Sequence, residues 1–97
     1  MAGKIQLGQV VQSKAGRDEG IYYVVIGLEK DFSFVYLADG NRRKVEKPKK
    51  KNPRHLCRLS SVIEDIRAKS RAGMRITNKE VAQALEKVRE KDQNKGV

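Results

Sequence analysis

Between residues 8 and 59, apolar side chains come in short runs separated by polar turns that contain glycine or proline, a pattern typical of β-strands. The run at residues 21–26 is apolar or aromatic throughout, which predicts a strand covered on both faces. The run at residues 32–38 alternates between two faces. The pattern predicts five short strands, over residues 9–13, 21–26, 32–38, 42–46 and 55–59.

An Asp-Gly pair at residues 39–40 is the strongest hairpin signal in the chain and predicts that residues 42–46 return as a strand. Residues 47–53 cannot continue that strand, because two prolines bracket them and proline lacks the N–H group that a central strand needs. We therefore expect an extended, flexible cationic loop that carries Lys49, Lys50 and Lys51.

After residue 59 the apolar period changes to that of helices. Ser61 and Glu64 match a capping box, which predicts a helix over residues 62–72 that Gly73 ends. The chain thus divides into a β-domain over residues 1–59 and a helical extension over residues 60–97.

A second capping box, at Thr77 and Glu80, predicts a helix that runs to about Glu90 and frays into a polar tail over residues 91–97. Its narrow apolar stripe recurs at helical spacing and must dock on the β-domain. The stripe consists of Val81, Ala84, Leu85 and Val88.

Phe34 and Tyr36 share one face of the alternating run, opposite Val35 and Leu37. An exposed aromatic pair could stack unpaired bases. We favour the other interpretation, in which the C-terminal helix covers the pair, because the helix stripe needs an apolar partner.

The chain of 97 residues holds 22 basic and 12 acidic residues, a formal net charge of +10. Residues 41–58 alone hold nine Lys or Arg and one acidic residue, a net charge of +8. Charge packed so densely repels itself unless a polyanion neutralises it, so we favour nucleic acid as the partner over a merely solubilising loop.

Other chemistry is sparse in this sequence. One Cys excludes a disulfide framework within the chain or a multi-cysteine metal site, and no leader or membrane-spanning segment is recognisable. His55 and Cys57 are the sole residues of their types, no third group is evident to orient them, and we expect a packed Cys beside a phosphate-contacting His. We expect a soluble, cytoplasmic protein that is not an enzyme and has no metal, cofactor, membrane or small-molecule substrate.

Two segments carry a resemblance to a known family. Residues 8–25, GQVVQSKAGRDEGIYYVV, resemble a KOW motif, and residues 38–51, ADGNRRKVEKPKKK, resemble its continuation in KOW-domain RNA-binding proteins akin to large-subunit ribosomal protein fourteen of archaea and eukaryotes. The resemblance covers about residues 5–59. It implies an SH3-like β-barrel of KOW type that binds RNA, most often ribosomal RNA, and that associates with the large ribosomal subunit.

Both the charge pattern and the resemblance indicate which residues contact RNA. Glycines in the loop between the first two strands permit sharp turns, and its backbone N–H groups can face a phosphate. Gly16, Gly20 and Gly40 are assigned to turns. The candidate RNA-binding residues are Lys14, Arg17, Arg42, Arg43, Lys44, Lys47, Lys49, Lys50, Lys51, Arg54 and His55.

Two other classes of function stay open at this point. The β-domain could be a protein-interaction adaptor whose basic loop is only an electrostatic anchor, or the chain could bind duplex DNA as a nucleoid or transcription-associated factor. Salt dependence separates the adaptor from the nucleic-acid binders, and preference for structured RNA over DNA separates the latter two.

Overall fold

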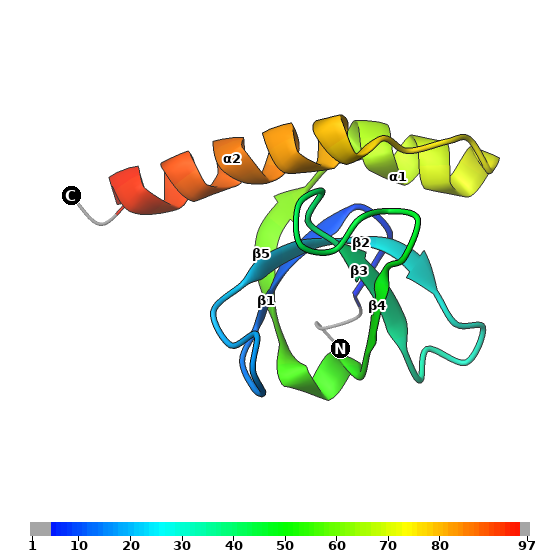
Figure 1. The fold of residues 1–97 in the computed structure, drawn as a ribbon, viewed down its shortest axis with the longest axis horizontal. Helices are drawn as coiled ribbons and strands as arrows, with labels where there is room; N and C mark the ends of the chain where they lie inside the picture. The colour runs from blue at the N-terminus through cyan, green and yellow to red at the C-terminus, as the bar shows by residue number, and fades with distance from the viewer. Residues whose placement is uncertain (1–4, 96–97) are drawn as a thin grey trace.

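A computed structural model describes residues 5–95 of the chain, with a five-stranded antiparallel sheet followed by two helices (Figure 1). The fold is therefore mainly β with C-terminal helices. The strands are β1 (Gln9–Ser13), β2 (Tyr22–Leu28), β3 (Val35–Ala38), β4 (Lys49–Lys51) and β5 (Leu56–Val62).

The strand order in the sheet is β4-β3-β2-β1-β5. The first four strands form a meander, and a short 3-10 helix, η1 (Pro53–His55), turns the chain so that β5 returns to pair with β1. Val11 in β1 lies between the two neighbouring strands, opposite Tyr23 of β2 on one side and Arg58 of β5 on the other. Within the described residues β4 and β5 are the two edges of a curled sheet and do not pair with each other.

Strand β1 has the predicted bounds, and β2 starts and ends slightly later than the predicted 21–26. Strand β3 is shorter than the predicted 32–38, and the fourth strand lies elsewhere in the chain. β4 consists of the three lysines at 49–51, and residues 42–46 form no strand, so both the predicted returning strand and the predicted flexible loop are wrong. Proline did not prevent a strand here because β4 is an edge strand, flanked by Pro48 and Pro53 rather than interrupted by them. The last strand also starts and ends later than predicted.

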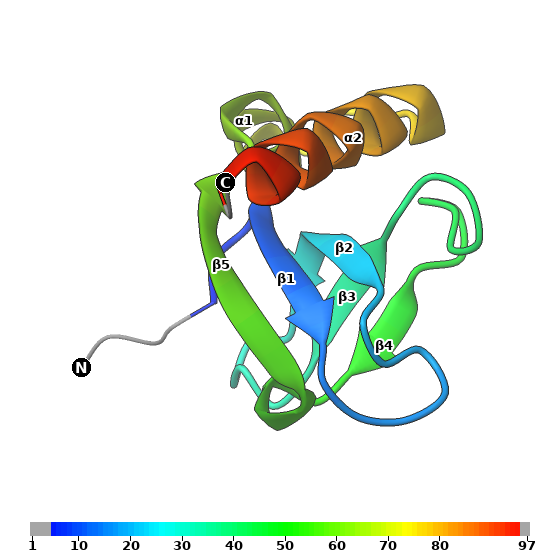
Figure 2. The ribbon, with the colours of Figure 1, turned by 90° about the vertical axis from the view of Figure 1, so that its left-hand side faces the viewer.

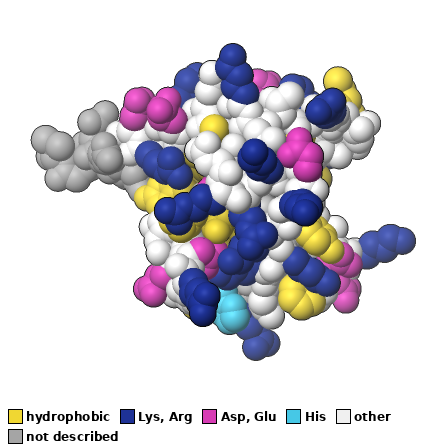
Figure 3. Space-filling model, viewed as in Figure 1, with side chains coloured by type: hydrophobic (Ala, Val, Ile, Leu, Met, Phe, Trp, Pro, Cys, Tyr) yellow, Lys and Arg dark blue, Asp and Glu magenta, His cyan; other side chains and the backbone are white. Residues whose placement is uncertain are grey.

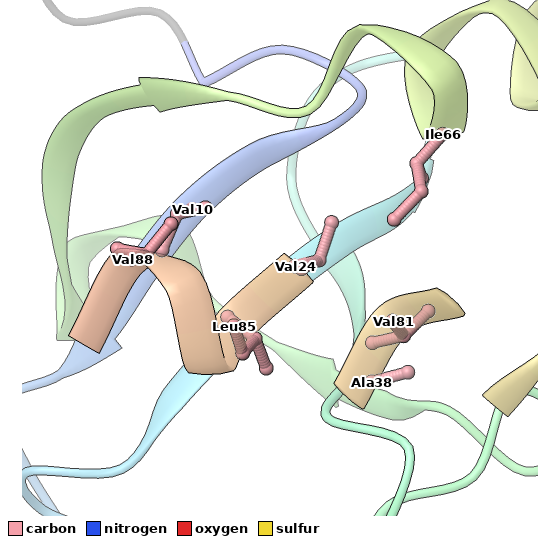
Figure 4. Packing of buried hydrophobic residues seen from close by; sticks show 7 residues of the cluster. All are labelled: Val10, Val24, Ala38, Ile66, Val81, Leu85 and Val88. Atoms are coloured by element: carbon pink, nitrogen blue, oxygen red, sulfur yellow. The ribbon is translucent and has the colours of Figure 1, made fainter. Parts of the chain in front are cut away.

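Strand β2 is covered on both faces, as its unbroken apolar run predicts. Inside the curl lies one apolar cluster to which four strands contribute, made of Val11, Tyr23, Val25, Val35, Leu37 and Leu56. On the outer face, Val10, Val24 and Ala38 pack against residues of the two helices (Figure 4). Alternation along β2 therefore sends Val24 toward the helices and its neighbours into the curl.

The helix α1 (Glu64–Ala72) begins later than predicted, because β5 continues to Val62. Ile63 is the N-cap residue and makes no side-chain capping bond, so the capping box predicted at Ser61 is wrong. Gly73 ends the helix in a left-handed conformation, as predicted, and its N–H group donates to the Ser70 carbonyl at 3.3 Å.

The capping box that opens α2 (Asn78–Lys95) is confirmed. The Thr77 N–H group donates to Glu80 Oε2 at 2.8 Å, and the Glu80 N–H group donates to Thr77 Oγ1 at 3.2 Å. The helix continues past the predicted end at Glu90, and residues 96–97 of the predicted polar tail lie outside the described part of the chain.

The apolar stripe of α2 docks on the sheet, as its spacing predicts, but not on the predicted aromatic residues. Val81, Leu85 and Val88 are buried. Their partners in the sheet include Ala38, at the end of β3, and not Phe34 or Tyr36, which lie farther back along the chain. The expectation that the C-terminal helix covers this aromatic pair is therefore wrong.

We expect Gly40→Ala to destabilise the protein more than Gly20→Ala. Both glycines have positive φ, +82° and +91°, so each alanine costs roughly 1–2 kcal/mol of backbone strain. A Cβ atom on Gly40 would also collide with the backbone oxygen of Asn78 in α2, whereas Gly20 has open space around it. Urea unfolding of the two variants measures the difference; equal losses would mean that α2 does not constrain this loop.

Candidate nucleic-acid interface

The loop at residues 14–20, between β1 and β2, turns on two glycines. Gly16 has φ of +88° and Gly20 of +91°, conformations that side chains with a Cβ atom rarely adopt. The Gly20 N–H group donates to the Ser13 carbonyl at 2.8 Å, and the Ser13 N–H group donates to the Ile21 carbonyl at 2.9 Å. These bonds close the loop and leave Lys14 and Arg17 exposed.

Asp18, in the middle of this loop, is the centre of a polar network that joins three elements. Its Oδ1 atom lies 2.7 Å from Lys51 Nζ and accepts a hydrogen bond from Ser13 Oγ at 2.8 Å. Its Oδ2 atom lies 3.1 Å from Lys49 Nζ and accepts from the Tyr23 hydroxyl at 2.8 Å. One carboxylate thus ties the loop to β1, β2 and β4.

The network holds Asp18 in its charged form. Burial alone would disfavour the carboxylate, but hydrogen bonds from Lys51, Ser13, Tyr23 and Lys49 outweigh burial and hold the pKa of Asp18 well below its ordinary value. Burial and the hydrogen bond to Asp18 raise the pKa of the Tyr23 hydroxyl above its usual range. The Tyr23 hydroxyl therefore keeps its proton at neutral pH and donates it to a charged acceptor.

Two of the three lysines of β4 therefore have structural partners. Lys51 is 8% exposed, and its Nζ atom also donates to the Ala15 carbonyl at 3.1 Å. Lys49 is partly buried against the same carboxylate. Lys50 alternates to the opposite side, where it is exposed and its Nζ atom lies 4.6 Å from the centre of the Phe34 ring. The structure thus leaves Lys50 as the most accessible of the three.

The long loop at residues 39–48 takes its shape from side chains rather than from a strand ladder. Asp39 Oδ1 accepts from the N–H groups of Asn41 and Arg43, at 2.9 and 2.8 Å. The Val45 N–H group donates to Asn78 Oδ1 of α2 at 2.8 Å. Because side chains satisfy these N–H groups, the backbone here has no need of a neighbouring strand, which explains why the strand predicted at residues 42–46 is absent.

The helical extension thus supports the loop at residues 39–48, called the basic loop below, directly. Besides accepting from Val45, Asn78 donates from Nδ2 to Glu46 Oε1 at 3.0 Å, and Gly40 lies against the backbone at the start of α2. The hydrogen bond from Asn78 lowers the pKa of Glu46, helped by the positive charges of Arg75 and Lys44. The start of α2 and the loop form one surface, which the sequence alone had divided between two units.

Most of the predicted RNA-binding residues are exposed. The loops at 14–20 and 39–48 project from the same side of the molecule, with β4 between them (Figure 2). Lys and Arg side chains gather over the middle of this face (Figure 3). The exposed candidates are Lys14, Arg17, Arg42, Arg43, Lys44, Lys47, Lys50, Arg54 and His55.

The loop at residues 14–20 is held by backbone and side-chain contacts that the sequence pattern does not predict. The Lys14 N–H group donates to the His55 carbonyl at 2.9 Å, which sets the first loop beside η1. The sequence pattern places Ser13 and Tyr23 in strands and Asn78 at the start of a helix. A strand pattern contains no signal that a Ser, a Tyr and two Lys will converge on one Asp.

His55 and Cys57 do not lie on one strand, although the sequence predicts a strand over residues 55–59, because His55 belongs to η1. Cys57 is exposed, so the expectation of a packed Cys is wrong. Among the described residues no group of His, Cys, Asp and Glu is arranged to hold a metal ion. No helix in that part of the chain is long and apolar enough to cross a membrane.

No protein-family model matches the chain. No curated protein matches it significantly.

We expect Asp18→Asn to destabilise the fold by roughly 3 kcal/mol, because it keeps the side-chain shape but leaves the buried Lys51 ammonium without a counter-charge. The loss should depend on pH. An unfolded Asp titrates near pH 4, and the folded pKa is lower, so the stabilising effect is complete above about pH 5 and disappears as the pH falls. Urea unfolding should show the wild type and the variant converging in acid.

Glu19→Gln is the matched control, since it removes the same charge from an exposed neighbour in the same loop. Its stability should stay close to that of the wild type at every pH. A constant gap between wild type and Asp18→Asn from neutral to acid pH would contradict the ionic role of Asp18.

Proposed function

We propose that this protein is a non-catalytic RNA-binding domain of KOW type, which contacts ribosomal RNA as a ribosomal or ribosome-associated factor. The observation that carries the proposal is the cationic segment at residues 41–58, most of whose Lys and Arg side chains are exposed. Arg42, Arg43, Lys44 and Lys47 make no ion pair with any side chain that the structure describes. Unneutralised cations at this density match a polyphosphate backbone.

The fold is compatible with the SH3-like barrel that the resemblance implies. Strand β5 returns beside β1 after a four-stranded meander, and residues from β1, β2, β3 and β5 share a single interior cluster. A small barrel needs such an interior, filled by inward-facing residues of successive strands. These features support the KOW assignment, which rests on the motif at residues 8–25 and its continuation.

The binding mechanism follows from which Lys and Arg side chains are paired within the fold and which are exposed. Asp18 holds Lys49 and Lys51, and these contacts brace the loop at 14–20. Asp39 and Asn78 brace the loop at 39–48. Two braced loops present exposed Lys and Arg side chains to phosphates, and the Arg side chains can bind a phosphate through two parallel hydrogen bonds. Such contacts set position and affinity rather than base sequence.

We expect replacement of Arg42, Arg43 and Lys44 together by Gln to weaken RNA binding and to flatten its salt dependence. Each phosphate contact contributes roughly −0.7 to −0.9 to the slope of log K against log salt, so the slope should become shallower by about 2–3. Fluorescence anisotropy with a structured ribosomal RNA fragment, over a range of salt concentrations, measures both effects.

The control variant replaces Arg71, Lys87 and Lys91 by Gln. It removes the same charge from exposed positions on the two helices. Its slope should remain close to that of the wild type. If both variants lost affinity equally, total charge rather than the basic loop would explain binding.

Association with ribosomal particles is tested by sedimentation of a cell lysate through a sucrose gradient at low and high salt. We expect the protein to sediment with the large ribosomal subunit and to move to the top after ribonuclease treatment. Ribonuclease-sensitive migration away from ribosomal particles would point to a different RNA. A protein that stays at the top in every condition would contradict the proposal and favour the adaptor.

Selectivity is tested by competition with duplex DNA of the same length. An RNA-binding domain that reads 2′-hydroxyl groups and A-form shape should prefer the structured RNA. Equal competition by DNA would favour the nucleoid or transcription-associated alternative.

A further inference from the structure

The outer face of the sheet has an aromatic half that the helices do not cover. In β3, Tyr36 pairs with Gly27 of β2, and a Cβ atom on that glycine would lie 3.2 Å from the Tyr36 ring. The missing side chain therefore makes room for the ring to lie against β2. Phe34, just before β3, is half-buried, and the Lys50 ammonium lies over its ring. Tyr36 and Lys50 are direct cross-strand partners.

The turn that leads into this half presents a third aromatic residue in an unusual conformation. Phe32 has φ of 60°, and within the described residues no other non-glycine residue has a positive φ. The side chain is also 50% exposed. A bulky residue in the left-handed region is strained, and such strain persists where the surrounding structure imposes it, often at a functional site.

Hydrogen bonds on both sides of Phe32 impose that conformation. The Phe32 N–H group donates to the Glu29 carbonyl at 3.0 Å, and the Glu29 N–H group donates to the Phe34 carbonyl at 3.1 Å. Asp31 Oδ1 accepts from the N–H and hydroxyl groups of Ser33, at 3.0 and 2.7 Å. The ring is thus presented at the tip of a braced hairpin.

We propose that Phe32 is a stacking platform for an unpaired nucleobase of RNA, with Lys50 placed to contact the adjoining phosphate. This inference rests on the proposed RNA-binding function and adds a site that would distinguish single strands from duplexes. An exposed aromatic ring stacks on any base, and a nearby cation neutralises the backbone that carries the base. The Cα atoms of Phe32 and Phe34 lie within about 7 Å of each other, and the Lys50 ammonium lies over the Phe34 ring, so Phe32 and Lys50 belong to the same end of the sheet.

The charges around the tip agree with this arrangement. Lys30 and Lys50 are exposed there. The two nearby carboxylates are engaged, since Asp31 accepts from Ser33 and Glu29 accepts from the Tyr36 hydroxyl. Lys50 also belongs to the cationic segment, so the tip is continuous with the proposed phosphate-binding surface.

The test is Phe32→Asn, because Asn tolerates positive φ better than most residues and removes the ring. Binding to a single-stranded oligouridylate should weaken by roughly fivefold or more, whereas binding to a blunt RNA duplex of the same length should change less than about twofold. The melting temperature should stay the same or rise, because the strained residue is gone. Lys50→Gln should weaken binding to both RNAs, because it removes a phosphate contact.

Met74→Asn is the matched control. Met74 is 60% exposed and lies in the connection between the helices, and the substitution replaces an exposed apolar side chain by the same amide as in Phe32→Asn. It should leave both affinities unchanged. Equal binding of oligouridylate by wild type and Phe32→Asn would overturn the stacking site and leave the proposed function standing. A large fall in melting temperature with loss of both RNAs would make Phe32 a structural residue. A wild-type protein that binds neither RNA would overturn the proposed function itself.

Discussion

The carboxylate of Asp18 is the constraint on which the basic surface depends. It lies among four donors from β1, β2 and β4, and without it two lysine ammonium groups would face each other beside a partly buried strand. Like charges in such a position would repel, and the shielding of water is reduced there. The pairing lets a run of three lysines form a strand at the edge of the sheet, and it fixes the loop at residues 14–20 against that strand.

The same arrangement divides the positive charge of the chain into two kinds. Lys49 and Lys51 are used within the fold, where their charge is matched. The cations of the 39–48 loop are exposed while its backbone is held by Asp39 and Asn78. A phosphate-binding surface gains from this division, because rigid loops lose little conformational freedom on binding and exposed cations need not break internal ion pairs.

The helices belong to this surface as much as the strands do. The buried stripe of α2 covers the half of the outer sheet face that contains Val10, Val24 and Ala38, and the start of the same helix supports the basic loop. The other half keeps its aromatic residues at the surface next to Lys50. The position of one helix thus determines both the shape of the cationic loop and which aromatic side chains stay accessible.

The order of residues along the chain predicts the features that depend on near neighbours. These include β1 and β2, the left-handed Gly73 that ends α1, the capping box of α2 and the apolar stripe that docks it. Three other features depend on contacts that are distant in sequence: the lysines at 49–51 form an edge strand, residues 42–46 form a loop, and α2 does not cover Phe34 and Tyr36. The physical reason is that each of these outcomes depends on a partner more than twenty residues away, such as Asp18 for Lys51 or Asn78 for Val45, and local periodicity carries no information about such partners.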